Sequence, residues 1–129
     1  MIVIDCSAVV DALTAVAGSE ALRSRIAVED LHAPSLLDYE VVSAVRGLVL
    51  RGQLTASRAA ECLSDFADLP VQRWSSADAL RRRTFQLRNT LSAYDAAYVA
   101  LAEALDCPLV TRDGRLARSA EHAALIEVL

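Results

Sequence analysis

The chain alternates between short apolar runs and longer segments in which apolar residues recur at helical spacing. The apolar runs are rich in β-branched residues, which favours strands. The strongest runs are apolar at every position, as in a parallel sheet covered on both faces. The predicted strands are residues 2–4, 31–33, 71–74, 109–111 and 125–128.

Predicted helices fill the intervals between these strands. Ser35 is expected to cap the helix that carries the clearest apolar stripe, with Asp38 as its capping-box partner and Gly52 at its end. That stripe consists of Leu37, Val41, Ala44 and Leu48. With their capping residues, the predicted helices are residues 8–17, 19–28, 35–52, 55–68, 75–89, 92–105 and 115–119. The alternation predicts an α/β/α sandwich with a central parallel sheet of about five strands.

Composition limits the classes of protein that the chain can represent. Its 129 residues, of which 54% are hydrophobic, predict a single domain over residues 1–129 with one core. A net charge of −4 argues against a passive, charge-driven nucleic-acid coat. Cys6, Cys62 and Cys107 are odd in number and form no C-x-x-C pair, which predicts a reduced, cytoplasmic protein. We expect neither a signal peptide nor a membrane span.

Four acids are expected to meet at one edge of the predicted sheet. Asp5 and Asp113 follow the first and fourth strands, and the carboxyl ends of parallel strands share an edge where ligands bind. Glu40 and Asp95 lie early in helices, and helices that follow strands begin at that same edge. Glu40 also has apolar neighbours three and four positions away, so its carboxylate needs a partner such as a metal ion.

Each acid also has a purely structural interpretation. Asp95 could complete a capping box with Ser92, and Asp113 could be a turn aspartate beside Gly114. Asp5 could serve the backbone alone, and Glu40 could lie on the surface if the helix phase is shifted. Accidental convergence of all four at one edge is less probable than any one of these alternatives.

Carboxylates gathered in this way suit hydrolysis of a phosphodiester. Mg²⁺ prefers carboxylate and water oxygens, and it can both activate a water and stabilise phosphoryl charge. We therefore expect Asp5, Asp95 and Asp113 to bind metal directly or through water, and Glu40 to bind metal or orient a water. The activated water would attack the phosphorus in line, leaving a 5′-phosphate and a 3′-hydroxyl. The hydroxyls of Ser7 and Thr111 could orient a carboxylate or a water.

These residues resemble the PIN-domain ribonucleases, and in particular the VapC toxins of bacterial toxin–antitoxin modules. The matching segments occur in the family's order and cover nearly the whole chain. They are Ile2-Val-Ile-Asp5-Cys-Ser7, Pro34-Ser-Leu-Leu-Asp-Tyr-Glu40-Val, Ser92-Ala-Tyr-Asp95-Ala-Ala-Tyr-Val-Ala-Leu-Ala and Pro108-Leu-Val-Thr111-Arg-Asp113-Gly-Arg-Leu. Each motif is short, but the ordered set is specific.

The resemblance implies an activity, a cofactor and partners. Members of the family cut RNA with Mg²⁺ or Mn²⁺, often at structured sites in transfer or ribosomal RNA. They commonly form homodimers, and a VapB-type antitoxin inhibits them. The family's acids correspond to Asp5, Glu40, Asp95 and Asp113, with Ser7 and Thr111 as supporting hydroxyls. Some members carry a further acid soon after the fourth, whereas Gly114 follows here, which leaves a second metal open.

Several arginines could take part in RNA binding or could be structural. Arg112 and Arg115 flank Asp113, so they could hold a phosphate, tune a carboxylate or form rim ion pairs. The predicted helix before Asp95 carries Arg81-Arg82-Arg83 and Arg88, which could line an RNA path or form a solvated basic face.

Two other functions compete with nuclease activity. An aspartyl-phosphate phosphatase would also place an aspartate after its first strand, but such enzymes normally use a lysine, and the chain has none. The absence of lysine also excludes a P-loop hydrolase. The second alternative is a catalytically inactive PIN-like binding module, which a metal titration would distinguish.

Overall fold

The computed structural model describes all residues, 1–129, and places a five-stranded sheet at the centre of the molecule. All neighbouring strands are parallel, in the order β3-β2-β1-β4-β5. The strands are β1 (Ile2–Ile4), β2 (Leu31–Pro34), β3 (Val71–Trp74), β4 (Leu109–Thr111) and β5 (Ile126–Val128). The prediction of a parallel α/β fold with about five strands is therefore confirmed.

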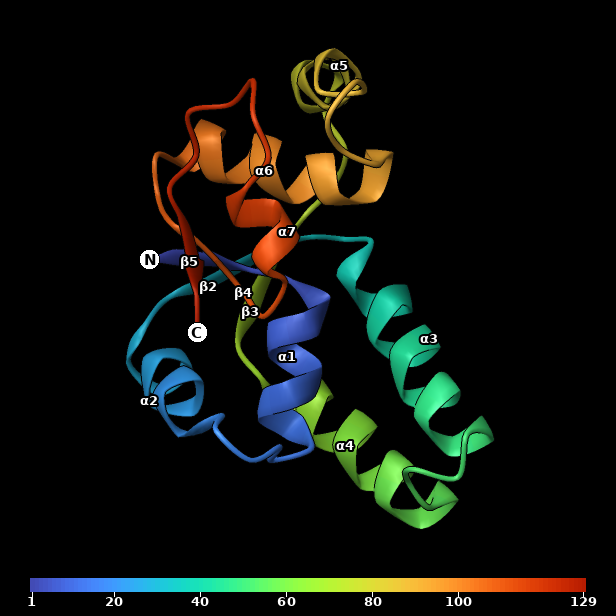
Figure 1. Cartoon of the computed structure of the whole chain (residues 1–129). Helices are drawn as coiled ribbons and strands as arrows, with labels where there is room; N and C mark the ends of the chain where they lie inside the picture. Colours follow the sequence, from blue (N-terminus) through green and yellow to red (C-terminus); the bar gives the residue numbers. More distant parts are fainter.

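Seven helices cover the two faces of this sheet (Figure 1). Helix α6 lies across β1, β2 and β4 with α5 packed against it, and α1 packs on the other side with α2, α3 and α4 around it. The pair α3 and α4 projects away from the sheet as a helical hairpin. The helices are α1 (Cys6–Leu13), α2 (Glu20–Val28), α3 (Leu37–Leu50), α4 (Ala56–Asp68), α5 (Asp78–Gln86), α6 (Ala93–Leu105) and α7 (Gly114–Ala117).

Strands β1 and β4 lie side by side in the middle of the sheet although they are distant in the sequence. Val3 pairs with Leu109 and Ile4 with Val110, and every residue of both strands is buried. A strand covered on both faces has no solvent side, which explains why neither sequence alternates with polar residues. The residues that follow these strands, Asp5 and Asp113, therefore emerge at the same edge of the sheet.

Two predicted helix starts are wrong. Helix α3 begins at Leu37 without a side-chain cap, because the Ser35 hydroxyl donates to the Trp74 carbonyl oxygen at 3.0 Å and joins β2 to β3. Helix α5 begins at Asp78 after Ala77, so neither Ser75 nor Ser76 caps it. At Ser35 a contact between strands replaces the local hydrogen bond that the sequence suggests, whereas the Ser76 hydroxyl and carbonyl oxygen accept from Arg81 of α5 itself.

Helix α1 begins two residues earlier than predicted because Asp5 caps it. The Asp5 carboxylate accepts a hydrogen bond from the Ala8 amide at 2.9 Å, and the helix starts at Cys6 directly after the strand. The predicted caps Thr55 and Ser92 are confirmed, each accepting from the amide three residues later. All three cysteines are free, and no helix is long and apolar enough to cross a bilayer.

Candidate active site

Asp5 is held rigidly at the carboxyl end of β1. Its side chain is 7% exposed, and both carboxylate oxygens accept hydrogen bonds. Oδ1 accepts from the Ser7 hydroxyl at 2.7 Å and from the Ala8 amide, and Oδ2 accepts from the Thr111 hydroxyl at 2.5 Å. The carboxylate therefore has one orientation, fixed by β1, α1 and β4 together.

The hydroxyls of Ser7 and Thr111 connect the two central strands around Asp5. Their oxygens lie 3.2 Å apart, and Thr111 is fully buried. The Thr111 hydroxyl oxygen also accepts from the Asp113 amide at 2.9 Å, and the Ser7 oxygen accepts from the Arg112 amide at 3.0 Å. The structure thus places both predicted supporting hydroxyls on Asp5, and it links Asp5 to the backbone of Asp113 through one oxygen atom.

Glu40 is half-buried on α3 and faces helix α6. Its Oε1 accepts a hydrogen bond from the Tyr98 hydroxyl at 2.6 Å, and Tyr98 is 2% exposed. Sequence reasoning missed Tyr98 as a site residue. The available signal was its spacing, because Tyr98 lies three residues after Asp95 and so shares its helix face. Tyr98 fixes the orientation of Glu40 as Ser7 and Thr111 fix that of Asp5.

Asp5, Glu40 and Asp95 lie close enough to repel one another. Burial raises the pKa of Asp5, hydrogen bonds from Thr111, Ala8 and Ser7 oppose that rise, and the negative charge of Asp95 adds to it. Burial also raises the pKa of Glu40 against the Tyr98 hydrogen bond, and the charges of Asp95 and Asp5 raise it further. Three of the four predicted acids therefore share one electrostatic site.

Asp95 occupies the first turn of α6 with its carboxylate unpaired. Its amide donates to the Ser92 hydroxyl at 3.2 Å, but no hydrogen bond or ion pair engages its side chain. Only half of the predicted capping box is present, so capping does not account for the carboxylate. Asp95 is the acid of the four whose oxygens are free to accept a ligand.

Asp113 stands at the same edge but carries its own cation. The Arg115 guanidinium donates from Nε to both carboxylate oxygens at 3.0 Å and from Nη2 to Oδ2 at 2.5 Å. The Arg115 amide donates to Oδ1 at 2.9 Å. These contacts hold the pKa of Asp113 below its usual range. Of the alternatives for Arg115, the structure shows an ion pair with the fourth acid.

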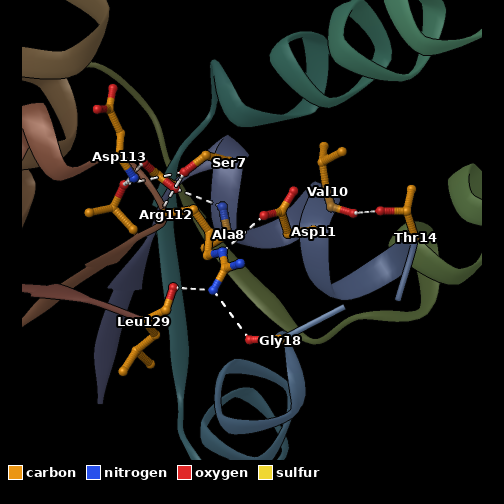
Figure 2. Close-up of polar contacts among 11 residues, drawn as sticks. Ser7, Ala8, Val10, Asp11, Thr14, Gly18, Arg112, Asp113 and Leu129 are labelled. Atoms are coloured by element: carbon orange, nitrogen blue, oxygen red, sulfur yellow. Dashed lines mark hydrogen bonds and ion pairs between the residues drawn. The ribbon is translucent and has the colours of Figure 1, made fainter. Parts of the chain in front are cut away.

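The Arg112 side chain points away from Asp113 (Figure 2). Its guanidinium donates to the Asp11 carboxylate at 2.9 Å and to the carbonyl oxygens of Gly18 and Leu129. Arg112 therefore joins α1, the loop before α2 and the end of the chain. Of the alternatives for Arg112, the structure shows an ion pair, with Asp11. The guanidinium does not face the four acids, and only the Arg112 amide bonds to the site, through Ser7.

Burial also shapes the neighbouring Cys6. Burial and the charges of Glu40 and Asp5 raise the pKa of its thiol to about 12, so the thiol stays protonated at neutral pH. This agrees with a packing role rather than a reactive one.

The arginines of α5 and of the turn that follows it are engaged within the protein. Arg83 forms a two-pronged ion pair with Glu103 of α6, and Arg82 pairs with Asp78 at 2.6 Å. Arg88 stacks on the Phe85 ring at 4.5 Å. Arg83 is therefore a structural tie between two helices, whereas Arg82 and Arg88 remain on the surface.

The donor set fits a hard divalent cation in its chemistry. Asp5, Glu40 and Asp95 offer carboxylate oxygens, and their mutual repulsion would be relieved by a positive charge. No group of three or more Asp, Glu, His or Cys side chains is already arranged as a cage. Mg²⁺ usually keeps several waters and takes only one or two carboxylates, so the arrangement suits it better than a fully dehydrated ion.

Two hollows lie beside the acids. The smaller, about 280 Å³, lies between α1 and α3 and includes Cys6, Ser7 and Asp11 in its wall. The larger, about 650 Å³, is mostly apolar and lies beyond β2 and β3, with Trp74 and Phe85 in its wall. None of the four acids lines either hollow. The chemistry of the site therefore rests on the carboxylates at the sheet edge rather than on a deep pocket.

Comparison with known proteins shows close full-length relatives. The PIN domain family model matches residues 2–122. Ribonuclease VapC12 of Mycobacterium tuberculosis is 41% identical over 129 residues, which cover 100% of this chain and 99% of that protein. Ribonuclease VapC9 of the same species is 43% identical over 129 residues, covering 100% of this chain and 98% of the relative.

Solved structures share the fold at lower identity. PAE2754 from Pyrobaculum aerophilum matches with a TM-score of 0.72 and 22% identity, covering 98% of this chain and 83% of that one. VapBC2 from Rickettsia felis, solved bound to a DNA fragment from its promoter, matches with a TM-score of 0.70 and 15% identity, covering 99% and 98%. These neighbours have the same arrangement of sheet and helices.

Proposed function

The chain belongs to the PIN-domain family, among its VapC members, and from that premise we propose that it is a metal-dependent endoribonuclease that acts as a toxin. The observation that carries the proposal is the shared electrostatic site of Asp5, Glu40 and Asp95, whose three carboxylates form no ion pair within the protein. The names of the full-length relatives support ribonuclease as the reaction class.

The metal ion is Mg²⁺ or Mn²⁺ in this proposal, held by Asp5 and Asp95 with Glu40 and Asp113 close by. When bound, it supplies charge stabilisation at the phosphoryl oxygens and lowers the pKa of a water molecule. Asp5 holds its position because Ser7, Ala8 and Thr111 fix both of its oxygens. Asp95 contributes oxygens that no other group in the protein uses.

Glu40 orients the attacking water. Its Oε1 is held by Tyr98, which leaves Oε2 free to accept a hydrogen bond from the water and then its proton. A bond forms between the water oxygen and phosphorus while the bond from phosphorus to the 3′-oxygen breaks. The 3′-oxygen takes a proton from solvent, so the products are a 5′-phosphate and a 3′-hydroxyl.

Cleavage of RNA with and without EDTA tests this proposal directly. Purified protein should cut a transfer or ribosomal RNA in Mg²⁺ or Mn²⁺, and EDTA should stop the reaction. Asp5→Asn should lower the rate by at least about 100-fold, because it removes a charge that acts in the transition state. Activity that survives EDTA, or a wild-type rate in Asp5→Asn, would exclude this mechanism. Stable RNA binding without cleavage would instead favour the inactive binding module.

We also propose a protein antitoxin and a homodimer as partners in the cytoplasm. The Rickettsia felis neighbour is VapBC2, which supports an antitoxin of the VapB type. The test is co-expression with a short reading frame that adjoins this one, followed by light scattering on the purified protein. An antitoxin should co-purify and suppress RNA cleavage, and the toxin alone should have twice the mass of one chain.

A further inference from the structure

Arg115 is the one cation of the protein that occupies an acid of the site. Its guanidinium and amide together engage both oxygens of Asp113, so no oxygen of that carboxylate is free of the pair. Asp5 is bonded only by neutral groups and Glu40 by a neutral hydroxyl. Asp113 is thus the acid that a divalent cation reaches only by displacing a positive charge.

The ion pair between Arg115 and Asp113 is exposed enough for the guanidinium to leave the carboxylate. The Arg115 side chain is 80% exposed, whereas that of Asp113 is 24% exposed. The guanidinium therefore loses little hydration in the pair and can return to solvent while the carboxylate stays in place. Each exchange is local, because Arg115 lies on the four-residue helix α7 two positions after Asp113.

A second acid also acts on Arg115. The negative charge of Asp95 favours the charged guanidinium, in addition to the larger effect of Asp113. Arg115 therefore lies within the field of two acids from distant segments, Asp95 in the first turn of α6 and Asp113 at the N-cap of α7. This places a positive charge beside the position where we propose that the divalent cation binds.

From this geometry we propose that Arg115 occupies Asp113 in the free protein, gives way to the divalent cation, and then binds a phosphate oxygen of the RNA. The inference rests on the proposed function and adds one residue to it. A guanidinium suits both positions, because its planar donors match carboxylate and phosphate oxygens equally well. After displacement, Arg115 is still only two residues from Asp113 in the chain. In this proposal its long side chain can therefore contact the phosphate that is being cut.

The proposal predicts opposite effects on metal binding and on RNA. Arg115→Ala should bind Mn²⁺ about fivefold more tightly in calorimetry without RNA, because Mn²⁺ no longer competes with the guanidinium. The same variant should raise KM for RNA about threefold or more, because a phosphate contact is lost. For Arg115→Lys, both the Mn²⁺ affinity and the KM should lie between those of the wild type and Arg115→Ala, because lysine keeps the charge but not the paired donors.

Arg118→Ala is the matched control for a general change of charge. Arg118 also lowers the pKa of Asp113 through its charge, but it makes no ion pair. Its Mn²⁺ affinity should change much less than that of Arg115→Ala, and its KM should remain near that of the wild type.

The outcomes separate this inference from the proposed function. If the wild type binds Mn²⁺ and cleaves RNA, but Arg115→Ala binds Mn²⁺ no more tightly than Arg118→Ala does, the role of Arg115 is wrong and the ribonuclease proposal stands. A tighter Mn²⁺ affinity with an unchanged KM would overturn the phosphate contact. A wild type that binds no Mn²⁺ would overturn both.

Discussion

Asp5 has two opposite effects on the stability of the fold. As the cap of α1 it stabilises the helix, but as a charged group that is 7% exposed it lies in an environment that favours the neutral acid. Its folded pKa is raised, so the charged form destabilises the fold above that pKa, and the penalty disappears as the pH falls below its unfolded value.

Asp5→Asn should therefore abolish cleavage and preserve or increase stability. Asparagine keeps the cap and removes the buried charge, so the free energy of unfolding at pH 7 in EDTA should rise by up to about 1 kcal/mol. The advantage should vanish at low pH, where Asp5 is neutral. Urea denaturation of both proteins at pH 7 and at low pH measures it. If Asp5→Asn is clearly less stable than the wild type at pH 7, the Asp5 charge does not destabilise the folded protein.

Tyr98→Phe should disturb the orientation of Glu40 while leaving the fold intact. The substitution removes the 2.6 Å hydrogen bond to Glu40 and keeps the ring in the core. We expect kcat to fall about tenfold with little change in KM, because groups that orient a metal-site ligand typically have effects of that size. Tyr94→Phe is the control, since Tyr94 lies on the same helix with 67% of its surface exposed. Equal rates for the two variants would remove Tyr98 from the site.

At the level of elements, a single carboxylate joins three segments. Glu103 of α6 accepts two hydrogen bonds from Arg83 of α5, and it also accepts from the Ala123 amide in the segment before β5. Arg83 donates to the Glu121 carbonyl oxygen as well. This contact fixes α5 and the segment before β5 onto the helix that carries Asp95 and Tyr98.

Glu103→Gln should lower stability in a pH-dependent way. Arg83 holds the folded pKa of Glu103 below its unfolded value, so the stabilisation is present above the unfolded pKa and is lost as the pH falls through the folded one. Denaturation should show a loss of about 1–2 kcal/mol at pH 7, and the loss should shrink as the pH falls through the folded pKa of Glu103. The exposed pair of Arg58 and Glu61 supplies the control, and Glu61→Gln should change stability much less than Glu103→Gln does. A loss that does not change as the solution is acidified would mean that packing, not the ion pair, is responsible.

Sequence reasoning succeeded where an element determines its own structure. Apolar runs such as residues 2–4 and 109–111 predicted buried parallel strands, and Thr55 and Ser92 predicted their helix starts. It failed at Ser35, whose hydroxyl bonds to Trp74 on the neighbouring strand, because a contact between distant segments leaves no local pattern.

The candidate site was likewise predictable only in part from the sequence. The four acids could be placed at one edge from strand ends and helix starts alone. The partner of Glu40 was missed, because Tyr98 resembles one more core residue of α6 unless its spacing from Asp95 is noticed. The opposite directions of the Arg112 and Arg115 side chains could not be predicted, because they depend on rotamers and on the nearby position of Asp11.

Considered as a whole, the molecule gathers negative charge at one edge, and a divalent cation should stabilise it. Mn²⁺ at 100 times its dissociation constant should raise the free energy of unfolding by about 2.7 kcal/mol, measurable as a shift in Tm. Asp95→Asn should remove most of that shift, because it deletes the free carboxylate, whereas Asp65→Asn on the exposed face of α4 should keep it. No shift in the wild type would contradict the metal site and favour a binding module.

The pairing of β1 with β4 also has a consequence for how the protein is made. Asp5 receives its Thr111 hydrogen bond only after residue 111 of the 129 has been synthesised, and Asp113 follows two residues later. During translation, a nascent chain that ends before β4 presents Asp5 and Glu40 on an incomplete sheet, without the strand that fixes them. A nascent chain therefore completes this constellation of acids only once residue 113 is available, and products truncated before β4 lack it.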